Sequence, residues 1–185
     1  MIVELHQAFM VPIFSHSVEG WGDHKEEIIS LMDLEKTDHR TGRNYYTDYY
    51  KYHKQGIRPK YADRVFDLLE PVFDELDQVF DVSYTLDSMW AQNYPKGGCH
   101  ELHNHGGLGY SAVLYVQLDE THLPTKFFSP FNDFWHGNLL EYIPNVKEGD
   151  IIFFPSVLAH TSPVVTSDKE RIIISFIINK AQCLS

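Results

Sequence analysis

The sequence predicts a mainly β protein, an antiparallel sandwich or barrel supported by helices on one side. Two observations lead to this fold class. Apolar residues at helical spacing are confined to the N-terminal half, and from Asp81 onward short apolar runs of period two are separated by Gly, Pro, Asn and Asp. With 185 residues, 43% of them hydrophobic, the chain can bury one core. We therefore expect a single domain over residues 1–185, with mixed helical support in 1–88 and the barrel core in 89–180.

Two helices and two edge strands are predicted in the N-terminal half. The runs MIVEL (1–5) and AFMVPIF (8–14) are short and apolar, and a proline suits an edge strand. Residues 24–34 place apolar side chains at helical spacing. Residues 62–80 do so more strongly, with acidic residues on the opposite side. Pro71 lies inside this second helix and should kink it or split it in two.

Tyrosines are concentrated between these two helices. Residues 44–61 contain Tyr45, Tyr46, Tyr49, Tyr50, Tyr52 and Tyr61. A tyrosine combines a large rigid ring with a polar tip, so this segment could form a rim that faces a substrate. It could equally cover the outside of a sheet, and the sequence leaves both interpretations open.

The C-terminal half is predicted to consist of strands. They cover residues 82–94, 101–105, 110–118, 126–128, 150–154, 162–165 and 171–178. Gly149 and Asp150 form a turn before the buried run Ile151–Phe154, which Pro155 ends. No repeat or Gly/Ser-rich linker divides the chain.

Charge and composition exclude several classes of function. The formal net charge is −11, and no block of basic residues offsets it, so a nucleic-acid backbone is not the expected partner. No apolar run approaches the length of a membrane span. The N-terminus has neither basic residues nor a small-residue cleavage site, which argues against a signal peptide. The two cysteines suit a reducing cytoplasm, with Cys99 as a free thiol.

Three histidines in the strand-rich half have the spacing of a metal site. His103 and His105 are two apart, and residues i and i+2 of a strand point to the same face. His160 opens a later strand, and in a rolled barrel it can approach the first two from the opposite strand. Three protein ligands on one face leave coordination positions open, which is typical of a catalytic site rather than a structural zinc site.

Neighbouring polar residues have weaker claims to this site. His100 should point to the face opposite His103 on a regular strand, and Glu101 should lie outside the ligand set or face the solvent. His6 and His136 are expected to be ordinary packing residues. His122 should be a loop residue, with substrate contact as a lesser alternative, and Lys96 should be a solvated turn lysine or else attract an anionic substrate.

The segment 93–105, NYPKGGCHELHNH, resembles the prolyl-4-hydroxylase-type entry into the fold of 2-oxoglutarate/Fe(II) dioxygenases. There a Tyr, a double Gly and a His-x-Asp pair follow at the same spacing. Residues 90–179 are also similar to a family of 2-oxoglutarate/Fe(II) oxygenases of bacteria and phages. The matching positions are Trp90, His103, His105, Ser111, Tyr115, Gly149, Phe154, Pro155, Ser156, His160, Arg171, Ser175 and Phe176. The resemblance implies a double-stranded β-helix, the jelly-roll barrel that cupins share.

The same resemblance implies roles for individual residues. Fe(II) would be bound by His103, His105 and His160. Arg171 would pair with the distal carboxylate of 2-oxoglutarate, a task that suits a planar guanidinium. Hydroxyls for the co-substrate would come from Tyr94, Tyr115 and Ser175. The implied enzyme is a dioxygenase, a hydroxylase that consumes O₂ and acts on a peptide side chain or a small molecule, between which fold analogy cannot choose.

Two departures from the family pattern affect these expectations. Position 105 is a histidine where the common ligand set has a carboxylate, so three neutral imidazoles would leave the full +2 charge on iron. Ile173 stands two residues after Arg171, where the family has a serine.

Two alternatives remain open. The Gly97, His103-x-His105 and Gly149…Pro155…His160 spacings also match a cupin-type three-histidine dioxygenase that uses no 2-oxoglutarate. The cupin glutamate is missing, however, and Val157 and Val164 replace its later Gly and Asn. The second alternative is a jelly-roll module that binds a ligand without catalysis. Against it, three buried imidazoles without partners would cost on the order of 1–3 kcal/mol each.

Overall fold

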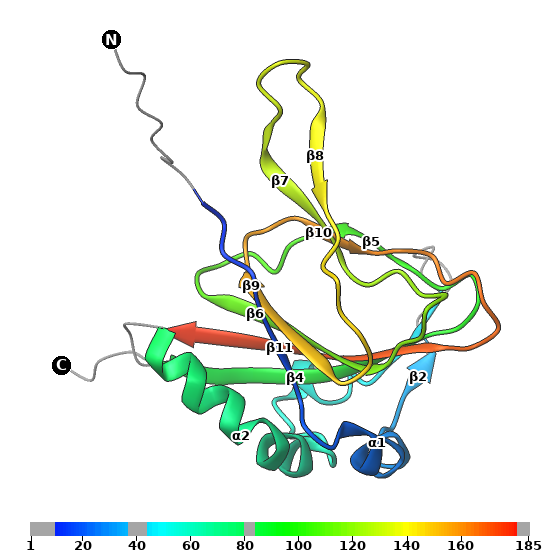
Figure 1. Ribbon diagram of the computed structural model, residues 1–185. Coiled ribbons are helices and arrows are strands. Elements are labelled where there is room, and N and C mark those ends of the chain that lie inside the picture. Colours follow the sequence, from blue (N-terminus) through cyan, green and yellow to red (C-terminus); the bar gives the residue numbers. More distant parts are fainter. Residues whose placement is uncertain (1–9, 37–43, 80–83, 181–185) are drawn as a thin grey trace.

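The computed structural model describes residues 10–36, 44–79 and 84–180 of the chain (Figure 1). Its helices are α1 (Trp21–Ser30), α2 (Ala62–Val79) and the short 3₁₀ helix η2 (His53–Gln55). Its strands are β1 (Phe14–Ser17), β2 (Glu35–Lys36), β3 (Tyr46–Thr47), β4 (Tyr84–Tyr94), β5 (His100–His103), β6 (Tyr110–Gln117), β7 (Lys126–Asn132), β8 (Leu139–Tyr142), β9 (Asp150–Pro155), β10 (His160–Ser162) and β11 (Arg171–Lys180).

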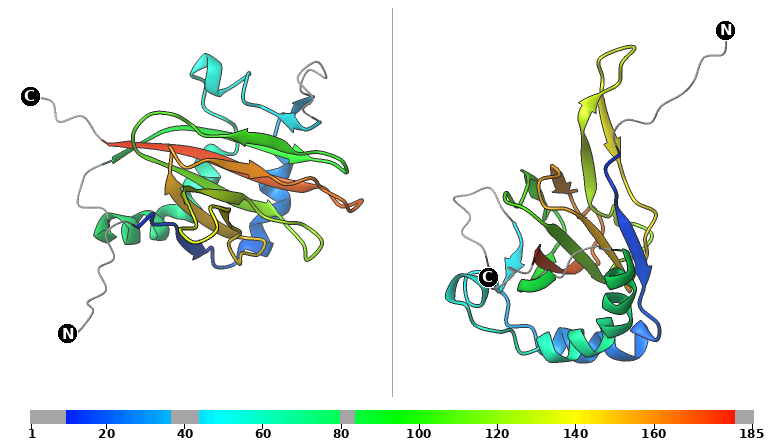
Figure 2. Two further views of the ribbon diagram at one scale, coloured as in Figure 1. Left: turned by 90° about the horizontal axis from the view of Figure 1, so that it is seen from above. Right: turned by 90° about the vertical axis from the view of Figure 1, so that its left-hand side faces the viewer.

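The strands form two antiparallel sheets that roll into a barrel, as the period-two pattern predicts. The larger sheet has the order β1-β9-β6-β11-β4-β3-β2, and the smaller has the order β5-β10-β7-β8. Helices α1 and α2 lie side by side against the outer face of the larger sheet (Figures 1 and 2). The barrel interior therefore lies between the two sheets, away from the helices.

Strand β11 shows how the sequence builds both sides of the larger sheet. Ile172, Ile174, Phe176 and Ile178 belong to the core beneath the helices, together with Leu69 of α2. Ile173 belongs to the second core, inside the barrel. Because alternate residues of a strand face opposite sides, Arg171 and Ser175 are on the same side as Ile173 and point into the barrel. Both faces are buried, so the strand is an almost continuous apolar run.

The predicted elements agree with the structure in type more often than in extent. Helix α1 begins three residues before the predicted helix and ends four residues earlier. Helix α2 is not split at Pro71, because that proline and Asp67, whose carbonyl it frees, both lie on the exposed side where water can solvate the carbonyl. The predicted edge strand over residues 1–5 lies outside the described residues, and β1 begins only at the end of the second apolar run.

One structural feature was not predicted at all. The sequence suggested a single strand over residues 126–128, but β7 continues to Asn132 and pairs with β8 in a hairpin that projects from the barrel (Figure 1). Every residue of β8 is exposed, so the apolar-in, polar-out alternation that marks a half-buried strand is missing there.

Gly149 marks a close approach between the helical layer and the barrel. Its φ of +86° is in the left-handed region, and a Cβ atom there would lie 2.7 Å from Cβ of Trp21. Its carbonyl accepts a hydrogen bond from the N–H of Val18, and its N–H donates to the carbonyl of Tyr115. Only glycine fits this position without strain.

None of the helices in the described part of the chain is both long and apolar enough to cross a membrane.

Candidate metal centre

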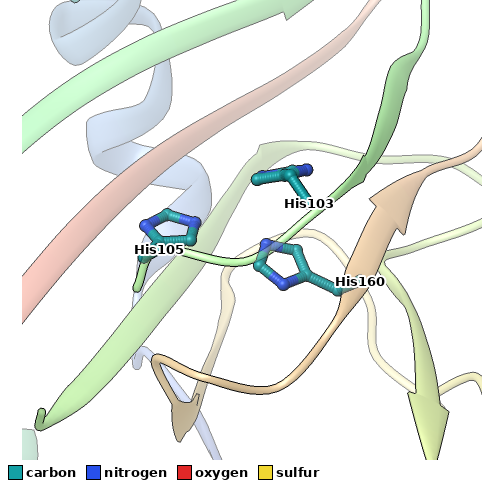
Figure 3. Close-up of side chains that lie close together, drawn as sticks. All are labelled: His103, His105 and His160. Atoms are coloured by element: carbon teal, nitrogen blue, oxygen red, sulfur yellow. The ribbon is translucent and has the colours of Figure 1, made fainter. Parts of the chain in front are cut away.

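The three predicted ligands come together at one point in the barrel mouth. His103 ends β5 and His160 begins β10, and the two residues are direct partners across these strands. His105 follows two residues after β5, and Figure 3 shows its ring beside the other two. One ligand atom from each residue can be chosen so that all three lie within 4.8 Å of one another. The ring centroid of His160 is 4.3 Å from that of His103 and 5.1 Å from that of His105.

Backbone carbonyls orient two of these imidazoles. Nδ1 of His103 lies 2.7 Å from the carbonyl oxygen of Glu101, and Nδ1 of His160 lies 2.8 Å from that of Leu158. Because a carbonyl only accepts hydrogen bonds, each Nδ1 carries the proton and donates it. In a neutral ring with Nδ1 protonated, Nε2 carries the lone pair, which is the form that ligates a metal.

His105 is held from the backbone and from its ring face. Its N–H donates to the carbonyl of Ser156 at 2.9 Å, and its ring stacks on Trp90 at a centroid distance of 5.7 Å. Burial, followed by repulsion from His103, lowers the pKa of His105 to about 4. The same two effects lower the pKa of His160 to about 3. Both rings are therefore neutral near pH 7, as metal ligands must be.

Glycines let the chain leave His105 and enter β6. Gly106 and Gly107 have φ values of +63° and +66°. Asn104 Oδ1 accepts the N–H of Gly106 at 3.1 Å, which closes this turn. The run GGLG (106–109) thus forms the connection from His105 to β6.

The expected orientation of His100 was wrong. Its ring centroid lies 4.0 Å from that of His103, and it lines the same cavity. The reason is a register shift: His160 pairs with His103 and Ser162 with His100, so three steps along β5 oppose two along β10. This bulge breaks the alternation and brings both histidines to one side.

The three histidines open onto a cavity of about 390 Å³ between the sheets. No Asp, Glu, Lys or Arg side chain is among the described residues that line it. One wall is aromatic, with Tyr49 stacked on His53 at 4.7 Å and edge-on to Trp90 at 5.3 Å. The neutral polar groups of the cavity come from Thr47, Gln92, Asn104, Thr125, Thr161, Ser162 and Ser175.

The tyrosine-rich segment divides between the two interpretations offered for it. Tyr45, Tyr49 and Tyr50 line the cavity beside the histidines. Tyr61 is instead fully buried in the core under the helices, so it does not contribute to a rim. Asp48 holds this segment against β4. Its carboxylate accepts hydrogen bonds from Ala91 N–H at 2.7 Å and from Tyr61 OH at 2.8 Å.

Arg171 is a buried cation without a carboxylate partner. The residue is only 1% exposed, and its guanidinium carbon lies 4.7 Å from the ring centroid of Tyr94. Nη1 donates to the carbonyl of Leu123 at 2.6 Å and Nη2 donates to Ser162 Oγ. Nε has no hydrogen-bond partner, and no acidic side chain in the described ranges forms an ion pair with this guanidinium.

The loop that carries Leu123 is fixed by His122. His122 is a loop residue, as expected, but its side chain is fully buried. Its Nδ1 accepts the N–H of Asp119 at 3.2 Å, and Nε2 lies 2.8 Å from the carbonyl of Lys169. This side chain therefore ties the loop before β7 to the loop before β11, next to Arg171.

The three predicted hydroxyl donors differ in their access to the cavity. Tyr94 and Ser175 line it, and Ser175 Oγ donates to Gln92 Oε1 at 3.2 Å. Tyr115 does not line it. The hydroxyl of Tyr115 donates to Thr125 Oγ1 at 3.0 Å and accepts the N–H of Thr125 at 3.1 Å. Burial raises the pKa of Tyr115 to about 12, so the phenol stays protonated.

Among the cavity residues that were not predicted, two have a signal in the sequence. Ser162 is two residues past His160, and Gln92 is two residues before Tyr94. Period-two alternation along β10 and β4 would have placed both on the inner face. His53 of the aromatic wall had no such signal, because η2 and the chain before it follow no regular period.

Other residues singled out in the sequence lie away from the cavity. Glu101 is exposed, and only its backbone carbonyl contacts a histidine. Lys96 is an exposed turn residue that pairs with Asp168 at 2.9 Å. Cys99 is a free thiol. His136 is not a packing residue: its side chain is 76% exposed at the tip of the β7–β8 hairpin. His6 lies outside the described residues.

The donor set fits a metal ion together with a dicarboxylate. Three imidazole nitrogens on one side of a cavity can hold a divalent ion and leave coordination positions open. The buried guanidinium of Arg171, with its unpaired Nε, fits the carboxylate of an anion. A metal-free packing role explains neither feature.

Comparison with known proteins agrees with this site. Residues 88–177 match a sequence family described as "Putative 2OG-Fe(II) oxygenase". The matched segment contains the three histidines and Arg171, and it agrees with the predicted enzyme class, a 2-oxoglutarate/Fe(II)-dependent oxygenase with iron and 2-oxoglutarate as cofactors. Among curated proteins, no sequence matches the chain.

Solved structures of the same fold confirm the double-stranded β-helix. A viral collagen prolyl hydroxylase from Paramecium bursaria chlorella virus-1, in complex with 2-oxoglutarate, has a TM-score of 0.60 and 16% identity over 92% of this chain and 96% of its own. A prolyl-4-hydroxylase of Pseudomonas putida has a TM-score of 0.57 and 14% identity, covering 91% and 92%. HygX of Streptomyces hygroscopicus, with nickel and 2-oxoglutarate bound, has a TM-score of 0.63 and 12% identity, covering 92% and 84%.

Proposed function

We propose, on the premise that residues 88–177 belong to the family of 2-oxoglutarate- and Fe(II)-dependent oxygenases, that this protein is a hydroxylase. His103, His105 and His160 hold Fe(II), and Arg171 binds the distal carboxylate of 2-oxoglutarate. The observation that carries the proposal is that a candidate cation site and a candidate anion site occur in the same barrel. Three neutral imidazoles can bind a cation, and one buried guanidinium without a carboxylate can bind an anion.

The bound iron and co-substrate would supply the oxidation: 2-oxoglutarate and O₂ are converted to succinate and CO₂ while one oxygen atom enters a C–H bond of the substrate. The chain itself provides position and exclusion of water. Glu101 and Leu158 carbonyls fix the tautomers of His103 and His160, so both Nε2 atoms face the metal position. The aromatic wall of Tyr49, His53 and Trp90 shields the open side of the site.

The third histidine alters the charge balance of the site. A carboxylate at position 105 would cancel one of the two positive charges of iron, whereas imidazole cancels none. Dianionic 2-oxoglutarate then becomes the main counter-charge, with Arg171 receiving its far end. We expect metal and co-substrate to bind cooperatively, each raising the affinity of the other by the same factor.

The cavity supports an uncharged substrate group, a peptide side chain or a small molecule. Its lining offers aromatic faces and neutral hydroxyl and amide groups, and no charged side chain among the described residues. Apart from the metal and the carboxylates of 2-oxoglutarate, a charged group would have to leave water without a partner, at a cost of several kcal/mol. Tyr49, Tyr50 and His53 are the side chains expected to contact the substrate.

The decisive experiment measures release of labelled CO₂ from 2-oxoglutarate in the presence of Fe(II) and O₂. Wild type should turn over, and His160→Ala and Arg171→Ala should each lose at least about 100-fold in rate. Lys96→Ala removes an exposed charge that does not belong to the cavity lining and serves as the matched control. Turnover unchanged in both site variants would rule the assignment out. O₂ consumption that needs no 2-oxoglutarate would assign cupin-type chemistry instead.

A further inference from the structure

The β7–β8 hairpin displays two large aromatic side chains to solvent. It projects beyond the barrel in Figures 1 and 2, and its tip is the turn 133–138. Phe134 and Trp135 at this tip are each 92% exposed. The other two tryptophans of the chain, Trp21 and Trp90, are buried. Neither the metal centre nor its cavity uses this hairpin tip.

The tip is held in one conformation although it is exposed. The carboxylate of Asp133 accepts hydrogen bonds from the N–H groups of Trp135, His136 and Asn138, each at 2.9 Å. The N–H of Asp133 donates to the carbonyl of Asn138, also at 2.9 Å, which closes the loop. Because the backbone is already fixed, burying the two rings against a partner would cost little conformational entropy.

The base of the same hairpin offers a complementary surface. A groove of about 330 Å³ is lined there by apolar side chains, among them Val11, Ile13, Phe127, Phe128, Pro130 and Leu158. Next to it, β8 is the outermost strand of the smaller sheet. All four of its residues are exposed, including Leu139, Leu140 and Tyr142. An exposed apolar edge strand is a template for pairing with another strand.

We propose that a second copy of this chain covers the hairpin in a symmetric dimer. Two β8 edges pair antiparallel about a twofold axis, and the tip of each hairpin reaches the groove at the base of the other. A twofold interface requires a surface that complements itself, and a tip and a groove at opposite ends of one hairpin meet that requirement. The proposal is independent of the proposed oxygenase activity.

The area of the patch agrees with this occupant. Phe134 and Trp135 expose roughly 400 Å², and the half-exposed Leu139, Leu140, Tyr142 and Ile143 add roughly 300 Å². Two copies would then bury about 1,400 Å², within the usual range of a specific protein interface. A single exposed patch of this size is larger than soluble monomers ordinarily carry.

The charge of the patch also permits self-association. Although the formal net charge is −11, the segment 126–143 has only Lys126, Asp133 and Glu141 as charged residues. Lys126 pairs with Glu141 at 2.8 Å, and the carboxylate of Asp133 is occupied by the loop N–H groups. Two copies can therefore approach here with little of the repulsion that their overall charge would produce elsewhere.

Sedimentation equilibrium over a range of protein concentrations tests the dimer, with tryptophan emission as a second measurement. The wild type should dimerise, and its emission should shift to the blue as concentration rises, because Trp135 is the only exposed tryptophan. The double variant Phe134→Ser/Trp135→Ser should weaken the dimer about 30-fold or more, as expected for two hot-spot aromatics. Leu108→Ser, which removes an apolar side chain 88% exposed outside the hairpin, is the matched control.

Leu140→Lys tests the edge strand without touching the tip. A lysine on β8 should also weaken the dimer while the circular dichroism spectrum stays that of the wild type. The proposal would be overturned if the wild type stayed monomeric over a 100-fold range of protein concentration. It would also be overturned if neither hairpin variant weakened the dimer. A blue shift produced by phosphatidylcholine vesicles but not by protein concentration would also overturn it, and would assign the patch to a lipid surface.

Discussion

Arg171 is a buried cation for which the described residues provide no anionic partner. Charged side chains are almost never fully buried unless they are paired. Here the guanidinium has a carbonyl, a hydroxyl and an aromatic face, and Nε has no partner. Burial lowers the pKa of Arg171, which expresses the same unfavourable desolvation.

We predict that Arg171→Met changes the free energy of unfolding of the unliganded protein by less than about 1 kcal/mol, because relief of the unpaired buried charge offsets the lost hydrogen bonds. In the wild type, 2-oxoglutarate at 100 times its dissociation constant should add about 2.7 kcal/mol of stability. Thermal unfolding with and without 2-oxoglutarate measures both effects. A variant that keeps the full stabilisation by 2-oxoglutarate would contradict the role given to Arg171.

Asp48 is another buried acidic or basic residue, and it supports the segment that carries Tyr49 and His53 of the aromatic wall. Its residue is fully buried, and this burial raises its pKa to about 6 despite the two hydrogen bonds it accepts. A carboxyl with a raised folded-state pKa stabilises the fold below its unfolded-state pKa of 3.8, and this contribution is lost as the pH rises through about 6.

The variant Asp48→Asn keeps the shape and removes the titration. Between pH 4 and pH 7, we expect the wild type to lose up to roughly 3 kcal/mol of stability relative to this variant, since the pKa differs by about two units between the folded and unfolded states. Urea unfolding of both proteins at several pH values measures the difference. Parallel stability curves for the two proteins would show that Asp48 does not titrate in this range.

At the scale of elements, the connection between α1 and β9 depends on one glycine. Gly149 combines a positive φ with a Trp21 side chain 2.7 Å from where its Cβ would be. Gly56 also has a positive φ, +65°, but nothing lies within 4 Å of its Cβ position. A substitution at Gly56 therefore tests backbone strain alone, whereas one at Gly149 tests strain together with steric overlap.

We predict that Gly56→Ala costs about 1 kcal/mol of stability, from strain alone. Gly149→Ala should cost about 2–4 kcal/mol, because Trp21 or the β9 turn must also move. Urea denaturation gives both values under the same conditions. Equal costs for the two variants would mean that the layers can separate freely at this point.

The sequence predicts elements well where burial imposes a period and poorly where it does not. Strands β4, β6, β9 and β11 were placed to within two residues of their described ends, because each is buried on one or both faces. Strand β8 was missed because its residues are all exposed. No buried face imposes an alternation of apolar and polar residues on it.

The same limit applies to the candidate site. The convergence of His103, His105 and His160 could be anticipated from spacing and resemblance, and the structure brings their ligand atoms together. The position of His100 could not, because it depends on a bulge between β5 and β10, strands that are 56 residues apart in the chain. Register shifts of this kind follow from tertiary packing, which no local pattern records.

For the molecule as a whole, the metal position lies where two short strands of the smaller sheet, β5 and β10, meet. Strand β5 has four residues and β10 has three, and the three histidines lie on these strands and on the loop after β5. A bound ion would cross-link them.

We predict that Mn²⁺, a redox-stable substitute for Fe(II), raises the melting temperature by roughly 5–10 °C at 100 times its dissociation constant. His160→Ala should abolish the shift, and His136→Ala, which removes an exposed histidine at the hairpin tip, should retain it. Calorimetry with and without a chelator measures the effect. A shift of the same size in both variants would mean that the ion binds elsewhere.

Strand β11 lies between β4 and β6 at the centre of the larger sheet, yet it is the last of the described strands in sequence order. During synthesis on the ribosome, β4 and β6 must therefore wait, with their apolar edges unpaired, until residues 171–180 have emerged from the exit tunnel. The larger sheet can therefore close only after this segment has emerged, and a nascent chain stalled before residue 170 would need a chaperone to stay soluble.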